Sequence, residues 1–230
     1  MTTGVGSPEP ADSTVWKSRT RLVDEVVEVI RDRIYEGGYA PGAPIRQEQL
    51  AAELNVSRTP LREALRMLER EGLVKVAPGR GLRVVTADLP ELLDAYEARE
   101  MVDGLAARLA ARRGDGAALA RLSAFVEEQA VALDPWVPSV YTAGNVAFHR
   151  AIVEASGNEH VVAQLPLVRM TSQIFTPLKL IDRERAVQAV AEHGAIVAAI
   201  AAGDELEAER CARAHISSTI DSLRQRLAAG

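Results

Sequence analysis

The sequence predicts a mostly α-helical protein in two parts: three helices followed by a β-hairpin, and then an all-α helical bundle. Apolar residues recur at steps of three and four along most of the chain, which is typical of helices with one buried face. The period changes to that of short strands over residues 73–85. A length of 230 residues suits one large or two small domains, and 47% hydrophobic residues are enough to form their cores.

The chain begins with a segment that has little to bury. Residues 1–14 contain mainly Gly, Ser, Thr, Pro and acidic residues, so we expect a flexible tail. A helix is predicted to follow and to end at Gly37-Gly38, with Pro41-Gly42 continuing the loop. The apolar face of this helix comprises Leu22, Val23, Val26, Val27, Ile30 and Ile34.

Two shorter helices are predicted next. The first covers Gln47–Leu54, and Asn55 can end it in a left-handed conformation. Ser57 is a natural N-cap for the other, Pro60 falls in its first turn, and Gly72 ends it. Its buried stripe comprises Leu61, Ala64, Leu65 and Leu68.

A hairpin completes the first part. Residues 73–76 and 82–85 have the composition of short strands, and Pro-Gly-Arg-Gly at 78–81 is a turn signal between them. Three helices followed by a hairpin form a winged helix-turn-helix, which we assign to residues 15–86. Residues 87–230 are predicted to form the all-α bundle. Turn signals divide this bundle into roughly six helices, with breaks near Gly114, Pro135, Gly157, Pro177 and Gly203.

Charge is distributed unevenly between the two parts. The formal net charge of −5 does not by itself suggest a nucleic-acid-binding protein. Residues 17–85, however, contain 13 Lys and Arg against 10 Asp and Glu, a net of +3, whereas residues 86–230 carry a net of −6. Only the first part would therefore be attracted to phosphate groups.

Three further features bear on the cellular compartment. The single cysteine, Cys211, cannot form an intrachain disulfide and lies in a helical pattern, as expected of a small buried hydrophobe in a reducing compartment. The N-terminus lacks the charged start and apolar run of a signal peptide. No apolar stretch is long enough to span a bilayer. We therefore expect a cytoplasmic protein with no membrane partner.

The third helix has the features of a DNA recognition helix. Arg58, Arg62 and Arg66 are four residues apart and share one face. Arg58 and Thr59 lie at its N-terminal end, which is the end that enters the major groove in helix-turn-helix proteins. Arginine can bind guanine or phosphate with two hydrogen bonds, and Arg80 at the hairpin tip can reach the minor groove or the backbone. The alternative is a solvated helix face with arginines paired to Glu63, Glu69 and Glu71.

The run LAAELNVSRTPLREAL at 50–65, followed by Leu68 and EGLV at 71–74, resembles the GntR family of bacterial transcription regulators. The resemblance covers about residues 20–85. One departure is Asn55, where many members carry Gly, but Asn tolerates the same backbone conformation. Arg46, just before the second helix, is a further candidate for phosphate contact. The resemblance implies that the DNA contacts include Ser57, Arg58, Thr59, Arg62 and, at the wing tip, Gly79.

The histidines of the second part suggest a common site. His193 lies ten residues before Gly203, and His215 lies eleven residues after Asp204. In an antiparallel helix pair both would sit at nearly the same height, about 15–17 Å from the turn. A third histidine from another helix could complete a three-imidazole site, which suits Zn²⁺ or Ni²⁺. The alternative is that each histidine is an ordinary half-buried residue.

Several motifs of the second part together resemble the FCD C-terminal domain of FadR-type regulators, over roughly residues 88–227. The motifs are YEAR at 96–99, FHRAI at 148–152, ASGN at 155–158, EHGAI at 192–196, AIAAGD at 199–204 and AHI at 214–216. In metal-binding members, three histidines and an acidic residue four positions before the first of them hold a divalent ion. The resemblance implies that His149, His193 and His215 are ligands.

The position of the acidic ligand is occupied by Asn145 in this chain. Its amide oxygen can still coordinate a metal, but it is neutral and therefore a weaker ligand. His160 matches no ligand position of the resemblance, and we interpret it as a helix-start residue near Asn158.

The resemblance implies ligand-controlled DNA binding by a homodimer, with a small carboxylate filling the open positions of the metal. Arg99 and Arg169 are the candidates for holding this effector. We expect a transcription regulator, with repression the commoner activity in the family. Two alternatives stay open: a DNA-binding dimer whose second domain binds no metal, and a metal-dependent enzyme. The sequence has no phosphate-binding loop, nucleophile elbow or HExxH pair to support the enzyme.

Overall fold

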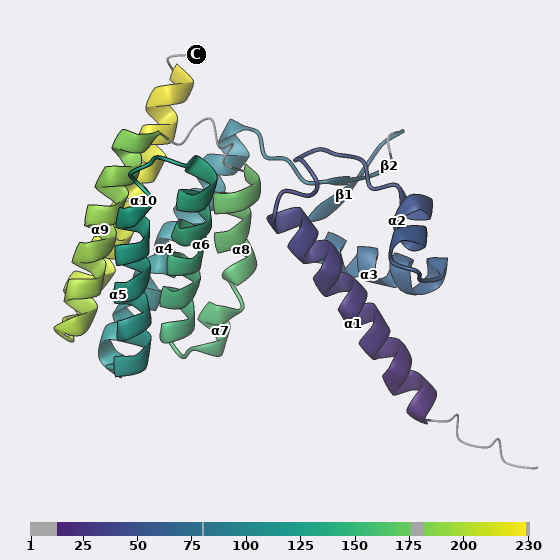
Figure 1. The fold of residues 1–230 in the computed structure, drawn as a ribbon, viewed down its shortest axis with the longest axis horizontal. Helices are drawn as coiled ribbons and strands as arrows, with labels where there is room; N and C mark the ends of the chain where they lie inside the picture. The colour runs from purple at the N-terminus through teal and green to yellow at the C-terminus, as the bar shows by residue number, and fades with distance from the viewer. Residues whose placement is uncertain (1–12, 80, 176–181, 229–230) are drawn as a thin grey trace, which may run out of the picture. The chain divides into compact units, whose positions relative to one another are not determined.

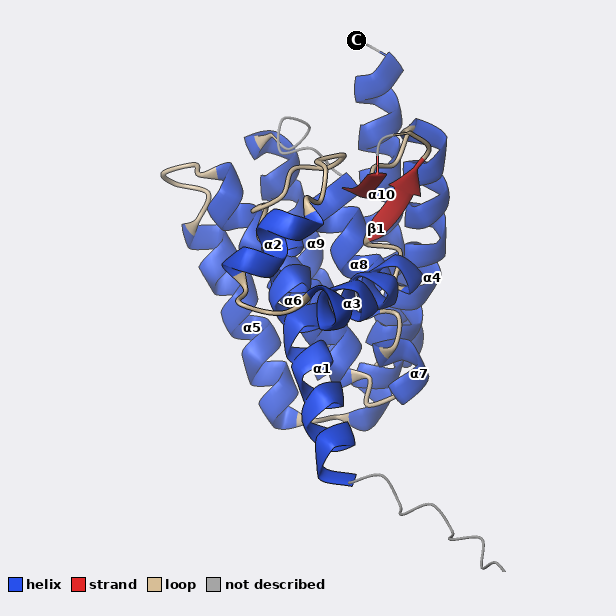
Figure 2. Cartoon of the chain, turned by 90° about the vertical axis from the view of Figure 1, so that its right-hand side faces the viewer, coloured by secondary structure: helices blue, strands red, loops and turns tan. Residues whose placement is uncertain are grey.

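The structure is a computed structural model that describes residues 13–79, 81–175 and 182–228. The chain forms two compact units, of which the first ends at Val85 and the second begins at Thr86 (Figure 1). Figure 2 shows that helices account for nearly all the regular structure, with strands confined to one small hairpin. In the described part of the chain, no helix is both long and apolar enough to cross a membrane.

The first unit is the predicted winged helix-turn-helix. Its hairpin is antiparallel, with Val74 opposite Val84 and Lys75 opposite Arg83. The mostly helical fold with a small two-stranded wing is therefore confirmed. The elements are α1 (Ser13–Tyr35), α2 (Gln47–Glu53), α3 (Arg58–Arg70), β1 (Val74–Ala77) and β2 (Gly81–Val84).

The local predictions for the first unit hold with small changes at the ends of elements. Helix α1 begins at Ser13 and so includes the last two residues of the segment 1–14 that was predicted as a tail, and the rest of that segment lies outside the described residues. Asn55 adopts the predicted left-handed conformation, with φ of 51°. Ser57 occupies the N-cap position of α3, but its side chain makes no capping hydrogen bond.

Apolar side chains from α1 and α3 form the core of the first unit. Ile30, Leu61 and Leu68 are fully buried, which agrees with the helical stripes of the sequence. Arg31 on α1 donates two hydrogen bonds to the Glu71 carboxylate just after α3, at 3.0 and 2.7 Å. This forked ion pair fixes the two helices against each other and holds α3 in a defined orientation.

The second unit contains seven α-helices and one π-helical segment among its described residues. The predicted number was about six, because segments of four to six residues are too short to show a helical period. The elements are α4 (Leu89–Arg113), α5 (Gly116–Val131), α6 (Pro138–Ala155), α7 (Glu159–Val162), α8 (Leu165–Arg169), the π-helical η1 (Met170–Phe175), α9 (Arg183–Ala201) and α10 (Glu205–Ala228).

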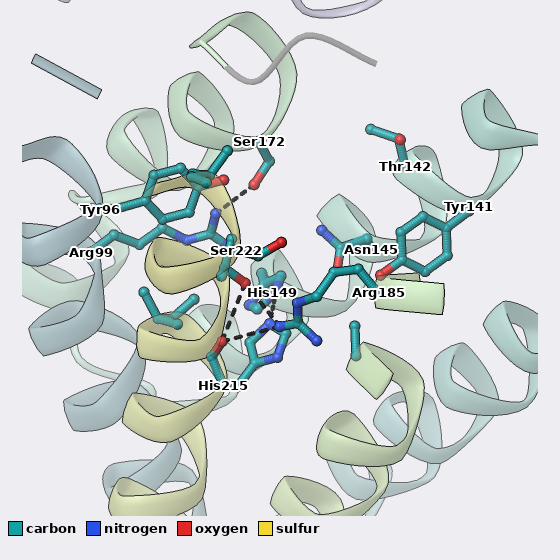
Figure 3. A pocket seen from close by; sticks show the side chains of 14 residues that line it. Tyr96, Arg99, Tyr141, Thr142, Asn145, His149, Ser172, Arg185, His215 and Ser222 are labelled. Carbon is teal, nitrogen blue, oxygen red and sulfur yellow. Dashed lines mark hydrogen bonds between the residues drawn. The ribbon is translucent and has the colours of Figure 1, made fainter. Parts of the chain in front are cut away.

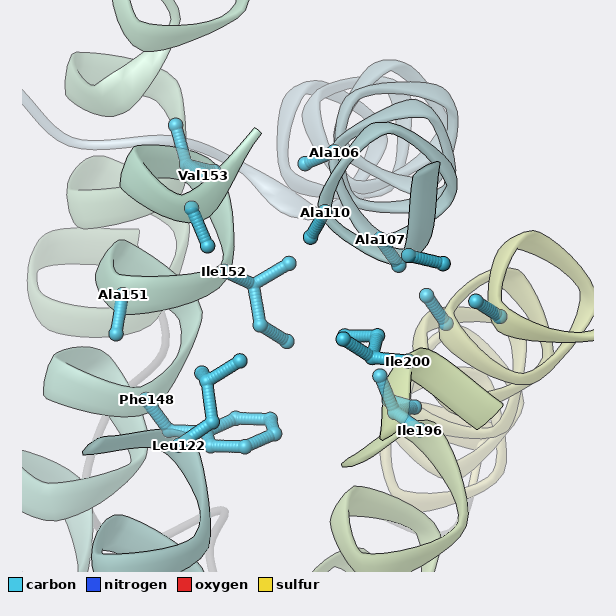
Figure 4. Close-up of a cluster of buried hydrophobic side chains, with 14 of the residues drawn as sticks. Ala106, Ala107, Ala110, Leu122, Phe148, Ala151, Ile152, Val153, Ile196 and Ile200 are labelled. Carbon is cyan, nitrogen blue, oxygen red and sulfur yellow. The ribbon is translucent and has the colours of Figure 1, made fainter. Parts of the chain in front are cut away.

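Helix α4 lies at the centre of the second unit, in contact with α6, α9 and α10. Asp88 and Glu91 form a reciprocal capping box at its start, and Gly114 ends it with a left-handed φ of 62°. The buried side of α4 carries small side chains that pack in one cluster with Ile152 of α6 and Ile200 of α9 (Figure 4). This close packing brings buried polar side chains of α4, α6, α9 and α10 near one another in the interior. The small residues of α4 are Ala106, Ala107, Ala110 and Ala111.

Candidate functional site

Three histidines from three different helices meet in the interior of the second unit. His149 of α6, His193 of α9 and His215 of α10 are all buried. The Nε2 atom of His215 lies 3.3 Å from Nε2 of His193 and 3.3 Å from Nε2 of His149. The prediction that His193 and His215 sit at the same height across the turn at Gly203 is therefore confirmed.

The other ring nitrogen of each histidine faces a side-chain oxygen. A carboxylate or amide oxygen can only accept a hydrogen bond, so it favours the tautomer with the hydrogen on Nδ1 and the lone pair on Nε2. The three Nε2 atoms therefore turn lone pairs toward a common point. The distances from Nδ1 are 2.9 Å to Asp103 for His149, 2.9 Å to Gln129 for His193 and 2.6 Å to Glu192 for His215.

Burial keeps the three imidazoles neutral. It is the main cause that lowers the pKa of His149 to about 3, and the Arg99 charge lowers it further. Burial also holds the pKa of His193 well below its ordinary value and lowers that of His215. Burial alone would raise the pKa of Asp103, but Arg99 and then His149 hold it below its usual value, so this carboxyl group stays ionised.

The cluster fits a divalent metal ion. The ligating atoms of His149, His193 and His215 lie within 4.8 Å of one another. Zinc–nitrogen bonds of about 2.0–2.1 Å at tetrahedral angles place two nitrogens ~3.4 Å apart, which is close to the 3.3 Å observed. Three lone pairs facing one another repel unless a cation lies between them. Donor type, spacing and tautomer thus all suit Zn²⁺ or a similar ion.

A cavity of about 70 Å³ opens beside the histidines. Figure 3 shows its side chains converging from different helices, with Arg99 and Arg185 among them. Asn145 lines the cavity one turn before His149, as the sequence predicts for a residue four positions away. The lining residues are Tyr96, Arg99, Tyr141, Thr142, Asn145, His149, Ser172, Arg185, Ala189, His215, Ile216, Thr219, Ser222 and Leu223.

Arg99 is held in the cavity wall by residues of the π-helical segment. Only 2% of its surface is exposed, and Nη1 donates to Ser172 Oγ at 2.6 Å and to Thr171 Oγ1 at 3.1 Å. Its Nε lies 3.3 Å from the carboxylate of Asp103. Nη2 is buried and has no hydrogen-bond partner among the described residues. This arginine can therefore donate to a bound ligand.

The second predicted arginine does not reach the cavity. Arg169 is half-buried at the end of α8, donates to Gln173 at 3.4 Å and is absent from the cavity lining. The π-helical turn that follows changes the register of the chain, so that Thr171 and Ser172 face Arg99 instead.

The second arginine of the cavity is Arg185 on α9, which was not predicted from the sequence. Its Nη2 donates to Glu192 at 2.9 Å and to Thr219 at 3.0 Å. Its Nε and Nη1 are buried without a partner among the described residues. The signal in the sequence was its spacing: Arg185 precedes His193 by eight residues, about two helical turns, and so shares its face.

The predicted DNA contacts of the first unit lie on its surface. Arg58 pairs with Glu48 at 2.8 Å, but both side chains are more than three-quarters exposed, so a phosphate can easily replace this contact. Glu71 pairs with Arg31 and not with the arginines of the α3 face. Arg80 lies outside the described residues, and Gly79 has a left-handed φ of 68°. The exposed predicted contacts are Arg46, Ser57, Arg58, Thr59, Arg62 and Gly79.

The two units match two known families of sequences. Residues 22–84 match the bacterial regulatory proteins of the gntR family, and residues 94–218 match the FCD domain. The match to the FCD domain covers the three histidines, Asn145 and both arginines of the cavity.

Named relatives match over most of the chain. A probable D-xylose utilization operon transcriptional repressor from Paenarthrobacter nicotinovorans is 30% identical over 202 residues, which cover 87% of this chain and 88% of the repressor. The HTH-type transcriptional repressor GlaR of Escherichia coli (strain K12) is 27% identical over 213 residues, 86% of this chain and 94% of its own length.

A solved structure shares the fold. The chain titled E. coli McbR/YncC superposes with a TM-score of 0.76 at 23% identity, covering 90% of this chain and 98% of that one. These matches identify a regulator and not an enzyme. The chain belongs to the GntR family of bacterial transcription regulators, with a DNA-binding winged helix-turn-helix followed by an FCD domain.

Proposed function

We propose that this regulator is a repressor whose affinity for operator DNA is controlled by a small organic acid, bound beside a divalent metal ion in the FCD domain. The observation that carries the proposal is the convergence of three histidine ring nitrogens next to a cavity that also contains Arg99 and Arg185. Two relatives are named as repressors, which supports repression as the mode of regulation.

His149, His193 and His215 would hold the ion, with the amide oxygen of Asn145 as a fourth candidate ligand. Zn²⁺ and Ni²⁺ suit imidazole ligands best. When bound, the ion would supply a concentrated positive charge and open coordination positions for a carboxylate. Asp103 connects the histidine cluster to the arginine that would bind the acid, because it lies beside both His149 and Arg99.

The cavity joins helices that ligand binding can shift against one another. Its residues come from α4, α6, η1, α9 and α10, so an acid bound there would contact most of the bundle. A homodimer fits an operator with two symmetric half-sites, and a change of packing in the bundle would alter the spacing of the two DNA-binding units. The competing function is a DNA-binding dimer that holds no metal, which the neutral Asn145 favours.

Operator binding titrated with organic acids tests the proposed control. For untagged protein loaded with Zn²⁺, at least one acid should change the dissociation constant of the operator about 5- to 150-fold, the usual range of allosteric coupling. The double variant His193→Ala with His215→Ala should bind operator without responding to that acid. Fluorescence anisotropy with a labelled operator measures both. Absence of any response across a broad panel of acids would contradict the proposal.

The proposed DNA contacts have a test that does not involve the ligand. Arg58→Ala and Arg62→Ala should each weaken operator binding by about 1–3 kcal/mol if each arginine contacts a base pair. Arg70→Ala is the matched control, because Arg70 is also exposed on α3 but lies at the opposite end from Arg58. A gel-shift series in which all three variants bind like the wild type would contradict the assignment of α3 as the recognition helix.

A further inference from the structure

We infer that the cavity selects a compact acid with two negative charges, a small dicarboxylate, and that Arg185 and Asn145 set this preference. The inference rests on the proposed metal and carboxylate site and adds the class of ligand to it. It follows from the charge balance of the buried side chains, from the unpartnered donors in the cavity wall and from the size of the cavity.

Each arginine of the cavity already has an acidic partner in the protein. The Nε atom of Arg99 lies 3.3 Å from Asp103, and both side chains are at most 3% exposed. Arg185 Nη2 lies 2.9 Å from Glu192. These two pairs are each neutral overall, so the arginines contribute no net charge for which a ligand must compensate.

The remaining side chains of the cavity are neutral. Besides the two arginines, the lining consists of hydroxyl, apolar and imidazole side chains and the amide of Asn145. A divalent ion held by neutral imidazoles and this amide would therefore bring two positive charges that no protein group balances. Uncompensated charge is costly away from water, so the best ligand carries two negative charges.

The unpartnered hydrogen-bond donors of the cavity wall also favour a ligand with more than one acidic group. Arg99 leaves Nη2 without a partner, and Arg185 leaves both Nε and Nη1. The two side chains come from α4 and α9 and reach the cavity as separate groups (Figure 3). One carboxylate directed toward the histidines would leave some of these buried donors unsatisfied, whereas a second carboxylate can accept from them.

The volume of the cavity favours a short acid. The cavity volume of about 70 Å³ corresponds to roughly five water molecules. A compact dicarboxylate of about three to five carbons matches this space.

Matched pairs of acids test the inference on the Zn²⁺-loaded full-length protein. Succinate is compared with butyrate, and malate with 2-hydroxybutyrate, so that each pair differs in one carboxylate. Calorimetry should give about 10- to 100-fold tighter binding of the dicarboxylate, the range expected for hydrogen bonds to a charged group. Equal affinities within both pairs would overturn the inference and leave the metal and carboxylate site standing.

Two variants test whether Arg185 and Asn145 set the preference for a dicarboxylate. Arg185→Gln should lower the advantage of the dicarboxylate to about threefold or less, while the bound zinc per chain stays the same. Asn145→Asp adds one negative charge and should also reduce the advantage, while zinc is held more tightly. Arg169→Gln is the matched control, since Arg169 is a half-buried arginine of the same unit outside the cavity.

The outcomes separate this inference from the function on which it rests. If the dicarboxylate keeps its full advantage in affinity in both Arg185→Gln and Asn145→Asp, the assignment of the preference to these two residues is overturned. If neither acid of either pair binds the Zn²⁺-loaded wild type, and a wider panel of acids also fails to bind, the proposed sensing of carboxylates is itself overturned. The comparison of acids on the wild type remains decisive even if Arg185→Gln fails to fold.

Discussion

Replacing His149, His193 and His215 together by alanine is expected to remove one divalent ion per chain and the stability that this ion provides. The triple substitution removes all three Nε2 atoms that would bind the ion, of which His215 Nε2 lies 3.3 Å from each of the other two. An ion present at 1,000 times its dissociation constant stabilises the folded state by about 4 kcal/mol. For a unit of this size, that corresponds to a melting temperature higher by on the order of 10 °C.

Elemental analysis of untagged protein measures the ion, and thermal unfolding with and without Zn²⁺ measures its effect. His160→Ala is the control, because His160 is exposed on α7 and should leave both results unchanged. Wild-type protein that takes up no ion after equilibration with Zn²⁺ and Ni²⁺ would refute the metal site. The regulator would then be the DNA-binding dimer without a metal, and the DNA-binding unit would be unaffected.

Asp103→Ala is expected to destabilise the second unit by about 3–5 kcal/mol, the cost of leaving one member of a buried ion pair without its partner. Asp103 is 2% exposed and balances the charge of Arg99, which is equally buried. It also lies 2.9 Å from Nδ1 of His149 and so orients a candidate metal ligand. Loss of such a group commonly lowers metal affinity 10- to 100-fold.

Urea unfolding of the metal-free protein measures the first effect, and competition with a zinc chelator measures the second. Glu97→Ala provides the comparison: Glu97 also lies on α4 and pairs with an arginine, Arg224, but both side chains are more than half exposed. Its loss should change the free energy of unfolding by no more than about 1 kcal/mol. Similar losses of stability in Asp103→Ala and Glu97→Ala would mean that the Asp103 pair has no special role.

The sequence predicts the first unit almost completely because its signals are local. The turn at Asn55, the start of α3 after Ser57 and the Pro-Gly-Arg-Gly hairpin each depend on neighbouring residues, and each lies where expected. The level placement of His193 and His215 was also predictable, since a single turn at Gly203 fixes both distances. Local signals do not predict the short helices α7 and α8 or the π-helical turn of η1.

The residues around the histidines were harder to predict because they depend on packing between helices. Gln129 comes from α5, 64 residues before His193, and no motif connects the two. Arg169 lies outside the cavity and Arg185 lines it, because the π-helical η1 and the packing of α9 against α10 decide which arginines reach the site. Asp103 could have been found, since it lies one turn after Arg99 on the same helix, where opposite charges attract.

The small residues on the inner face of α4 determine how this protein can vary in evolution. Ala106 and Ala107 have almost no side chain to shorten, so a substitution there can only add volume to a filled interior. At Gly104 even a methyl group would lie 2.5 Å from Cγ of Arg213 on α10. Variation on α4 should therefore concentrate at outward positions such as Met101, which is 55% exposed. The helix that carries Arg99 is thus kept in place by steric selection, whatever ligand the cavity comes to bind.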